Sequence, residues 1–399
     1  MPTIHVVGTN GKTSVVHLVS SLLVALGVRV GATTSPHLED VAERFRIDGR
    51  PIDDALLDRA CVALEDVRPG VEARIEQPVT FFDAVTAIAL WSFVEAEVDV
   101  AVVEAGIGGI GDATNVVDSA VTVITPVGFD HPQLGGTLDV IAREKASVVA
   151  PGGILLSAPQ PPAAAAAIAE VAAERGARLI RVGHEIGVLT RRPAPDGQLV
   201  GLRGLGDLQV RARLPLRGVH QATNAALALA AVQAHLGRTD LDLDRVRNGF
   251  VTAAVPGRVE LVRRPGGPSL LLDGAHDVAA VRALVAAVRE GVGTARCVVV
   301  LGVGGEREAG PLVAHLRELP GATFVVTRSE APTATPVAVV AGQLRAAGIA
   351  SVEAPDVAAA CETALALAGS DGLVVVTGSL HLVGAARRWV RGRGGLPCG

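Results

Sequence analysis

The feature that most constrains the fold of this chain is a glycine-containing loop at residues 8–14. A short apolar run, Ile4–Val7, precedes the loop, and apolar residues at helical spacing follow it over Val15–Leu26. This order of strand, loop and helix lets backbone N–H groups and a helix N-terminus bind phosphate. Lys12 is then expected to reach the terminal phosphates of a nucleotide, and the hydroxyl of Thr13 can bind Mg²⁺. An ordinary glycine turn between a strand and a helix is the alternative interpretation.

Length and composition limit the class of protein. A globular chain of 399 residues, 49% hydrophobic and 19% charged, is long enough for two domains. Aromatic residues make up only 2% and the formal net charge is −5, so a nucleic-acid-binding surface is not expected. The four cysteines form no CxxC pair, which argues against a zinc site or a disulfide framework. With no apolar run of membrane-spanning length and no basic leader, we expect a cytoplasmic protein with no membrane partner.

Apolar strands alternate with helical segments through the first part of the chain, which favours a doubly wound α/β fold with a parallel sheet. Polar side chains follow several of the expected strands: Ser35–His37 after 29–34, Glu104 after 98–103, and Asp130 with His131 after 120–125. Ligands bind outside the carboxyl ends of such strands. The sequence therefore predicts one active site where these ends and the 8–14 loop meet.

The remaining pattern predicts a second α/β domain. Residues 181–216 alternate between polar and apolar and predict short antiparallel strands, and the Pro- and Gly-rich stretch 255–268 is the best candidate for a linker. We expect domains at 1–260 and 265–399. The expected helices are 53–65, 80–94, 138–149, 159–173 and 222–236, and the strands of the second domain are 270–273, 296–301, 323–327 and 373–377. The segment 41–54 is expected to be charged and rich in turns.

Several candidate residues carry both a functional and an ordinary interpretation. Glu104 ends a buried strand and needs a cation there, and Mg²⁺ bound to nucleotide phosphates is the obvious one. A partnered structural glutamate is its alternative. His131 is either a metal or phosphate ligand or an ordinary histidine, and Lys145 would normally lie on a solvated helix face. The glycine-dense stretch 106–115 is interpreted as a flexible loop over the site.

Taken together, the motifs resemble the folylpolyglutamate synthase/dihydrofolate synthase family within the Mur ligase superfamily. Their order and spacing along nearly the whole chain carry the resemblance. They are Gly8-Thr9-Asn10-Gly11-Lys12, Thr34-Ser35-Pro36-His37-Leu38, Thr80-Phe81-Phe82, Glu104-Ala105-Gly106, Asp112-Ala113-Thr114-Asn115, Asp130-His131, Arg143-Glu144-Lys145-Ala146, His220-Gln221 with Asn224, Pro256-Gly257-Arg258, Asp273-Gly274-Ala275-His276 and Thr377-Gly378-Ser379-Leu380.

The resemblance implies a P-loop ATPase domain of the Mur ligase central type, followed by a smaller Rossmann-like α/β domain that binds an amino acid. It also implies an ADP-forming carbon–nitrogen ligase. A substrate carboxylate attacks the γ-phosphate of ATP to form an acyl phosphate, and the amine of an amino acid then displaces phosphate. Because carboxylate and ATP repel each other, cations must neutralise the gathering charge. A monomer that adds L-glutamate to a pterin-containing carboxylate, with ATP and two Mg²⁺, is the expected enzyme.

The resemblance assigns roles to individual residues. The catalytic residues are Lys12, Glu104, His131 and Lys145, the last as a carbamate that binds the second Mg²⁺. The metal ligands are Thr13, Ser35, Glu104, His131 and Lys145. The ATP-binding residues are Gly8, Thr9, Asn10, Gly11, Lys12, Thr13, Ser14, Asn224, Arg258, Asp273 and His276. The substrate-binding residues are Thr80, Phe81, Phe82, Ala113, Asn115, His276 and Ser379.

Some positions near the expected substrate depart from the family's pattern. Ile110 stands where the family has an arginine, Asp277 stands where asparagine is usual, and 304–307 replace a usual Lys-Asp pair. The helical segment that usually precedes the phosphate loop is missing. These departures favour an alternative, a ligase of the same chemistry that joins an amino acid to a non-folate acid in a specialised pathway. A non-catalytic nucleotide-binding protein is a third hypothesis, against which the four catalytic residues argue.

Overall fold

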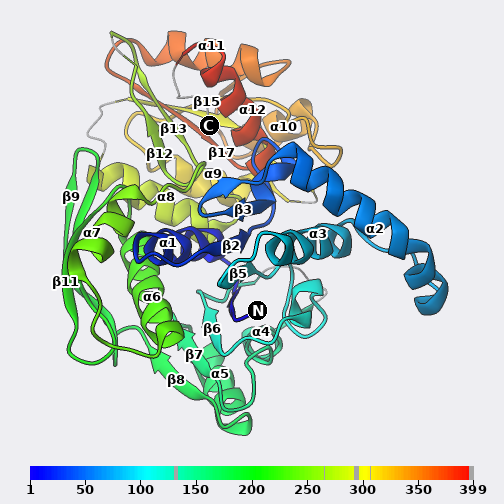
Figure 1. Ribbon diagram of the computed structural model, residues 1–399. Coiled ribbons are helices and arrows are strands. Elements are labelled where there is room, and N and C mark those ends of the chain that lie inside the picture. Colours follow the sequence, from blue (N-terminus) through cyan, green and yellow to red (C-terminus); the bar gives the residue numbers. More distant parts are fainter. Residues whose placement is uncertain (130–133, 265, 292–295, 306, 395–399) are drawn as a thin grey trace. The chain divides into compact units, whose positions relative to one another are not determined.

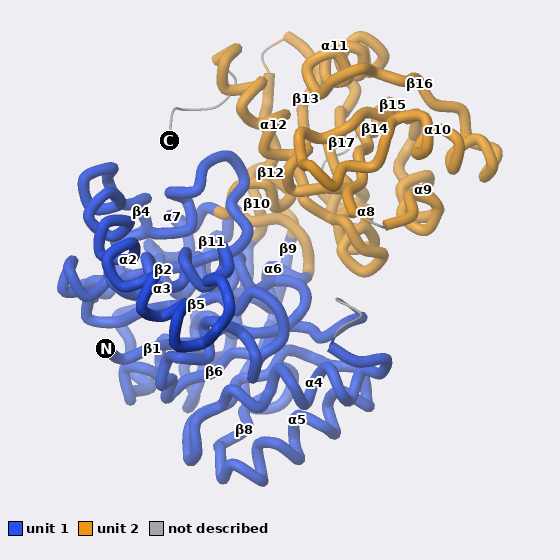
Figure 2. The backbone as a smooth tube through the Cα atoms, turned by 90° about the vertical axis from the view of Figure 1, so that its right-hand side faces the viewer, with its two compact units in different colours: residues 1–192, 199–215, 220–254 blue, residues 193–198, 216–219, 255–399 orange. Residues whose placement is uncertain are grey.

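The computed structural model describes residues 1–129, 134–264, 266–291, 296–305 and 307–394. The chain divides into two compact units, coloured separately in Figure 2. Unit 1 comprises residues 1–192, 199–215 and 220–254, and unit 2 comprises residues 193–198, 216–219 and 255–399. Among the described residues, no helix combines the length and the apolar composition that crossing a membrane requires.

Unit 1 is built on an eight-stranded sheet with the strand order β4-β3-β2-β5-β1-β6-β7-β8. The pairs from β2 to β8 are parallel, as the sequence predicts, because continuous apolar runs such as 100–103 are buried on both faces. The strands are β1 (Thr3–Val7), β2 (Val30–Thr33), β3 (Phe45–Ile47), β4 (Arg50–Pro51), β5 (Val100–Glu104), β6 (Val121–Ile124), β7 (Ile154–Ser157) and β8 (Arg178–Arg181).

The strands β3 and β4 lie within the segment 41–54, for which the sequence predicted turns but no strand. Phe45 pairs with Thr33 of β2 in an antiparallel ladder, and its side chain is buried. The short helix η1 (Val41–Arg44) directly precedes β3. The charged residues of this segment obscured the alternation of apolar side chains that marks an edge strand.

The helices of unit 1 cover the sheet (Figure 1). One apolar cluster joins α4 and α5 to β6 and β7, another joins α3 to β5, and α1 packs against β1, β2 and β5. The strands β9 (Gly187–Ala194), β10 (Gly197–Arg203) and β11 (Gln209–Leu214) form a separate three-stranded sheet, which confirms the predicted short strands. The helices are α1 (Lys12–Ala25), α2 (Asp54–Ile75), α3 (Phe81–Glu95), η2 (Ala113–Val116), α4 (Leu138–Ala146), α5 (Pro162–Glu174), α6 (Val219–Leu236) and α7 (Leu243–Thr252).

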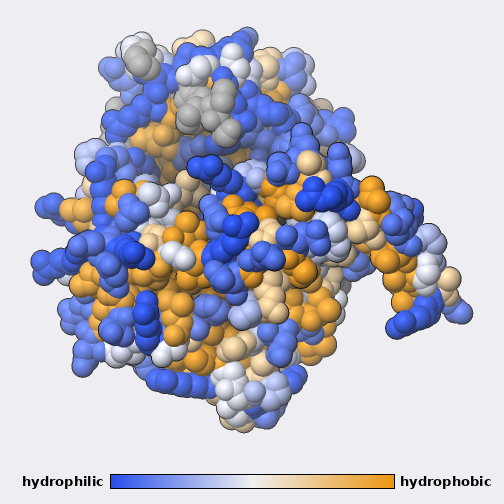
Figure 3. Space-filling view, in the orientation of Figure 1, coloured by the Kyte–Doolittle hydropathy of each residue, from blue (hydrophilic) through white to orange (hydrophobic). Residues whose placement is uncertain are grey.

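Helix α2 continues past the predicted end at Glu65 and contains Pro69. Proline removes the hydrogen bond to the carbonyl four residues earlier, which is that of Glu65. This stretch of α2 is exposed, so water can bind the freed carbonyl and the helix can continue. In Figure 3 apolar and polar surface alternate along α2, whose exposed apolar residues include Val62, Val67 and Ile75.

Unit 2 is a second α/β sheet with the strand order β12-β13-β17-β14-β15-β16, parallel except for β12. The strand β12 lies inside the predicted linker 255–268, because Leu261 and Val262 pair with the apolar β13. The strands are β12 (Glu260–Val262), β13 (Ser269–Leu272), β14 (Cys297–Leu301), β15 (Thr323–Val326), β16 (Ser351–Glu353) and β17 (Leu373–Thr377). The helices are α8 (Val278–Gly291), α9 (Ala309–Leu316), α10 (Val337–Ala346), α11 (Val357–Ala368) and α12 (Leu380–Arg391).

Candidate active site

The loop between β1 and α1 requires glycine at two positions. Gly8 has φ +134°, and a Cβ on it would lie 2.0 Å from the hydroxyl oxygen of Thr125. Gly11 has φ +97° and directly precedes α1, where a Cβ would lie 3.0 Å from Oδ1 of Asn224. No side chain in the described part of the chain caps α1. The first-turn N–H groups of α1 can therefore bind an anion.

The side chains of Lys12 and Thr9 make hydrogen bonds that hold this loop in place. The Lys12 ammonium donates to the carbonyls of Gly8 at 3.1 Å and Thr9 at 3.2 Å, so it lies over the loop that it follows. The Thr9 hydroxyl donates to the carbonyl of Gly128 at 3.2 Å and accepts from its N–H at 3.1 Å. The loop is thereby fixed to the segment that follows β6.

Three of the predicted metal ligands, Thr13, Ser35 and Glu104 itself, meet at the Glu104 carboxylate. Its Oε1 accepts a hydrogen bond of 3.0 Å from the Thr13 hydroxyl, and its Oε2 accepts one of 3.2 Å from the Ser35 N–H. The carboxylate is 3% exposed at the end of β5, where Glu104 is in register with Val6 of β1. Hydroxyl and carboxylate oxygens are the ligands that Mg²⁺ prefers. No cluster of three or more His, Cys, Asp or Glu suited to a metal occurs within the described ranges.

Of the two other predicted metal ligands, Lys145 lies within the described residues and His131 does not. His131, with its neighbour Asp130, lies outside the described residues. Lys145 lies on α4 and is 2% exposed, although a charged helical segment would normally lie on the surface. A Cβ on Gly109 would lie 3.0 Å from the Cα of Lys145, so the loop after β5 packs on this part of α4. Lys12 and Lys145 are the two lysines of the sequence.

Helix α6 contributes amide side chains next to the phosphate loop. Nδ2 of Asn224 donates to Oε1 of Gln221 at 3.1 Å, and Nε2 of Gln221 donates to the Ser14 hydroxyl at 3.1 Å. All three side chains are buried. Asn224 thus lies beside Gly11 of the loop between β1 and α1.

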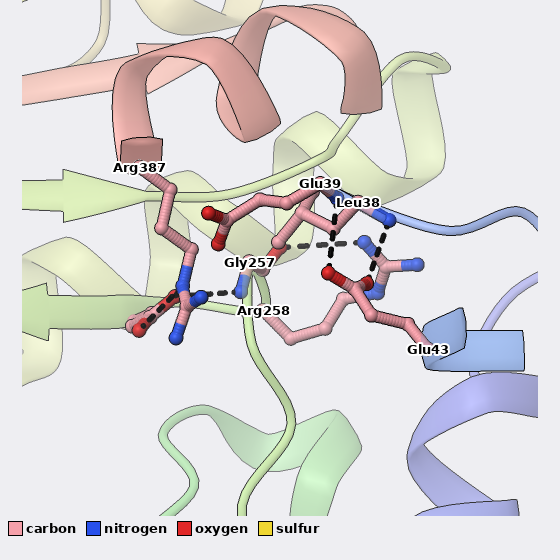
Figure 4. A network of polar contacts seen from close by, with 7 residues as sticks. Leu38, Glu39, Glu43, Gly257, Arg258 and Arg387 are labelled. Carbon is pink, nitrogen blue, oxygen red and sulfur yellow. Dashed lines mark hydrogen bonds and ion pairs between the residues drawn. The ribbon is translucent and has the colours of Figure 1, made fainter. Parts of the chain in front are cut away.

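Arg44 is a residue of this region that the sequence analysis missed. Its Nε donates to Nδ1 of His37 at 2.9 Å, and its guanidinium carbon lies 5.3 Å from the ring centre of Phe81. Burial lowers the pKa of Arg44, and the nearby Glu104 carboxylate opposes that shift. The sequence did contain one sign of this arrangement. Asp40 and Glu43 form a capping pair at the start of η1, the short helix that ends at Arg44. The Glu43 carboxylate also accepts from the N–H groups of residues 38 and 39 (Figure 4).

The residues expected near the acid substrate have mixed surroundings. Thr80 caps α3, where its hydroxyl accepts from the N–H of Asp83 at 3.1 Å. Phe81 is 61% exposed, whereas Phe82 packs on Gly106, where a Cβ would lie 2.6 Å from the ring. Ala113 begins η2 and is half-buried.

The stretch 106–115 is anchored, which corrects the expectation of a flexible loop. Three consecutive N–H groups, of residues 109–111, donate to Oε1 of Glu144 at 3.3, 2.8 and 3.4 Å. The Asn115 amide donates to the carbonyl of Ile110 at 3.0 Å, and the Asp112 carboxylate accepts from the N–H of Ile107 at 2.7 Å. Gly108 and Gly109 let this loop pack closely on α4, and Gly106 lets it pack on Phe82 of α3.

In unit 2, the predicted residues Asp273 and His276 follow β13. The Asp273 carboxylate accepts from the N–H groups of Val259 at 2.7 Å and Ala275 at 2.9 Å. Burial raises the pKa of Asp273, and the Arg258 guanidinium and these N–H groups oppose the shift. Burial lowers the pKa of His276, whose Nδ1 lies 2.9 Å from the carbonyl oxygen of residue 274.

The turn that carries Arg258 is held by a half-buried ion pair. The Gly257 N–H donates to the Glu260 carboxylate at 2.8 Å, and Nε of Arg387 donates to the same carboxylate at 3.1 and 3.0 Å. Figure 4 shows Gly257, Arg258 and Arg387 around this turn. Val259 has φ +49°, which is rare for a β-branched residue.

Two more residues of unit 2 belong to the predicted motifs. Asp277 accepts from the N–H of Ala280 at 2.8 Å in the first turn of α8, a capping role that asparagine can also fill. Ser379 occupies the N-cap position of α12, and its side chain makes no capping hydrogen bond with the described residues.

Comparison with known proteins identifies the class that this fold and site define. The Mur ligase middle domain matches residues 6–232, and the Mur ligase glutamate ligase domain matches residues 257–380. The protein is an ATP-dependent carbon–nitrogen ligase with an α/β ATP-binding region and a second α/β region.

The similar proteins define the family. The dihydrofolate synthase/folylpolyglutamate synthase of Mycobacterium tuberculosis is 38% identical over 418 residues, covering 97% of this chain and 85% of that protein. The M. tuberculosis folylpolyglutamate synthase complexed with ADP and AMPPCP has a TM-score of 0.92 at 36% identity, with coverage of 97% and 90%. Escherichia coli FolC in complex with DHPP and ADP has a TM-score of 0.84 at 29% identity, with coverage of 98% and 89%. The chain therefore belongs to the folylpolyglutamate synthase/dihydrofolate synthase family.

Proposed function

We propose that this protein uses ATP to join L-glutamate to a pterin-containing carboxylate, either dihydropteroate or a folate. The observation that carries the proposal is the meeting of Thr13, Ser35 and Glu104 beside the phosphate loop. A relative named for dihydrofolate and folylpolyglutamate synthesis aligns with 97% of the chain, and another relative was solved with DHPP and ADP. The substrate class in this proposal follows from these relatives.

We infer that Mg²⁺ belongs to this site, because the side chains of Thr13, Ser35 and Glu104 each offer an oxygen atom to a metal ion. When bound, the ion neutralises phosphate charge and so lets a carboxylate approach ATP. His131 and Lys145 are proposed for a second Mg²⁺ on the basis of the family resemblance. Lys12 would hold the terminal phosphates, and the N–H groups at the start of α1 would bind further phosphate oxygens.

Further residues of both units are proposed to contact the nucleotide, the amino acid and the acid substrate. Asn224 of unit 1 and Arg258, Asp273 and His276 of unit 2 would contact the nucleotide, and His276 with Ser379 would contact the amino acid. Thr80, Phe81, Phe82, Ala113 and Asn115 would line the acid pocket. Arg44 is a further candidate for that pocket, since its buried guanidinium lies against the exposed ring of Phe81.

A substrate panel tests the proposed function. ADP formation is measured with dihydropteroate, tetrahydrofolate and several non-pterin aromatic acids, each with L-glutamate, L-aspartate or no amine. The pterin acids with L-glutamate are expected to give the highest kcat/KM, and the products are identified by mass spectrometry. Turnover with non-pterin acids alone would instead support the ligase for a different acid, which Ile110 in place of an arginine favours.

The carbamate on Lys145 has a direct test, because the sequence holds two lysines. We expect ¹³C-bicarbonate to produce a carbamate signal in the NMR spectrum of the wild-type protein. Lys145→Ala should lack this signal, and Lys12→Ala should retain it. Short carboxylic acids should restore part of the activity of Lys145→Ala. A spectrum without a carbamate signal, together with no rescue, would reject the carbamate as the working group.

We place the reaction in the cytoplasm, where ATP is available and thiols stay reduced. The structure describes Cys61, Cys297 and Cys361 as free thiols. Burial raises the pKa of Cys297 to about 11 and that of Cys361 to about 12, which keeps both unreactive. A monomer remains the predicted oligomeric state.

A further inference from the structure

We propose that Glu144 and the His5–Thr114 pair are positioning residues that hold the loop 106–116 as a preformed wall for the acid substrate. The proposal rests on the proposed function, because Ala113 and Asn115 of this loop are expected to line the acid pocket. Neither Glu144 nor His5 is itself proposed to touch a substrate.

The first anchor is an anion-binding nest that Glu144 fills. The N–H groups of residues 109–111 converge on one carboxylate oxygen, with the shortest distance, 2.8 Å, from Ile110. Successive N–H groups that point to one side of a turn form a concave site for an anion. A Cβ on Gly109 would lie 2.2 Å from the carbonyl oxygen of Glu144, so the loop backbone lies directly on α4. Because Glu144 precedes Lys145, this anchor ties the loop to the helix that carries the proposed carbamate.

The second anchor is a buried chain of hydrogen bonds between the loop and β1. The Thr114 hydroxyl donates to Oδ1 of Asp112 at 2.5 Å. Its oxygen therefore accepts from Nε2 of His5, which lies 2.9 Å away. His5 and Thr114 are 0% and 2% exposed.

This arrangement fixes the tautomer of His5. With the proton on Nε2, Nδ1 carries a lone pair, and Nδ1 has no partner in the described part of the chain. Burial lowers the pKa of His5 to about 4, so the ring is neutral near pH 7. A neutral His5 can donate its single proton only to Thr114, which makes the hydroxyl of Thr114 the link between β1 and the loop. His5 lies three residues before Gly8, so the same strand carries the phosphate loop and this anchor.

The two anchors hold the loop on both sides of the half-buried Ala113. Residues 109–111 are tied to α4, and Asp112 with Thr114 is tied to β1. A preformed wall binds its substrate without first ordering a loop, so loss of an anchor should weaken acid binding more than ATP binding. Glu144→Ala removes the acceptor of three N–H groups. Glu144→Gln keeps a carbonyl oxygen in the same place.

The test combines kinetics with amide hydrogen exchange. In Glu144→Ala we expect the KM for the acid to rise at least about tenfold, with the KM for ATP within about twofold of wild type. Exchange in peptides that cover residues 107–111 should accelerate at least about tenfold, and Glu144→Gln should recover most of both effects. Thr114→Val should show the same split in KM, and Thr114→Ser should restore it.

Glu170→Ala is the matched control. Glu170 is exposed on α5 and pairs with Arg143 of α4, so its loss removes a contact to the same helix without touching the loop. Its kinetics and exchange should match wild type. A folded Glu144→Ala with an unchanged acid KM and unchanged exchange would overturn the proposal, as would equal increases in both KM values. If wild type fails on all pterin acids, the proposed function fails, while the exchange of residues 107–111 still decides whether Glu144 anchors the loop.

Discussion

Replacing Lys12 by alanine is expected to lower the turnover of this ligase by at least about a hundredfold. The ammonium lies over the phosphate loop, within 3.2 Å of the carbonyls of Gly8 and Thr9. The positive charge is placed to offset the charge that builds up as a carboxylate meets the terminal phosphate, and no other lysine except Lys145 exists in the chain. ADP formation under saturating substrates measures the effect.

Arg29→Ala is a suitable control for Lys12→Ala. Arg29 also carries a positive charge, but it is exposed and directly precedes β2, at the amino end of the strand. Its loss should leave turnover within about twofold of wild type, as for most surface substitutions. Near-normal rates in Lys12→Ala would contradict the role assigned to the ammonium.

Glu104→Ala should be similarly severe, with at least about a hundredfold loss of turnover. The substitution removes the carboxylate proposed to bind Mg²⁺ and leaves the Thr13 hydroxyl and the Ser35 N–H without their acceptor. Glu104→Gln separates these two effects, because it keeps an acceptor oxygen but removes the negative charge. Both variants are assayed for ADP formation over a range of Mg²⁺ concentrations.

If the charge of Glu104 is what matters, Glu104→Gln should be nearly as slow as Glu104→Ala while its thermal unfolding stays closer to wild type. Glu95→Ala, at the exposed end of α3, provides the control for loss of an unrelated carboxylate. Activity in Glu104→Gln that matches wild type at every Mg²⁺ concentration would exclude the proposed metal role and leave a structural glutamate.

The parallel core and the meeting of strand ends were predictable because their physical signals are strong. An uninterrupted apolar run such as 100–103 needs burial on both faces, and a polar residue at its end must lie at the carboxyl edge of the sheet. That reasoning was sufficient to place Glu104 near the phosphate loop. It could not supply the hydrogen bonds from Thr13 and Ser35, which depend on side-chain geometry.

The features that the sequence did not predict involve charged or turn-forming residues whose surroundings come from tertiary structure. A charged residue in a turn-rich segment is expected to be exposed, yet Arg44 is buried. Its guanidinium donates to His37 and lies over the ring of Phe81. Pro69 predicts the end of a helix, yet α2 continues because its backbone there remains open to water. The glycine-dense stretch 106–115 predicts a flexible loop, and only the position of α4 reveals that Glu144 holds residues 109–111.

The edges of the large sheet in unit 1 have a consequence for the protein in crowded solution. An outermost strand with free N–H and C=O groups can recruit a strand from another molecule. At one edge β4 has only two residues, one of which is Pro51 and lacks an N–H. At the other edge β8 begins and ends with the exposed Arg178 and Arg181, and charged side chains on an edge strand disfavour its pairing with another chain. Both edge strands of the eight-stranded sheet therefore carry features that oppose edge-to-edge aggregation.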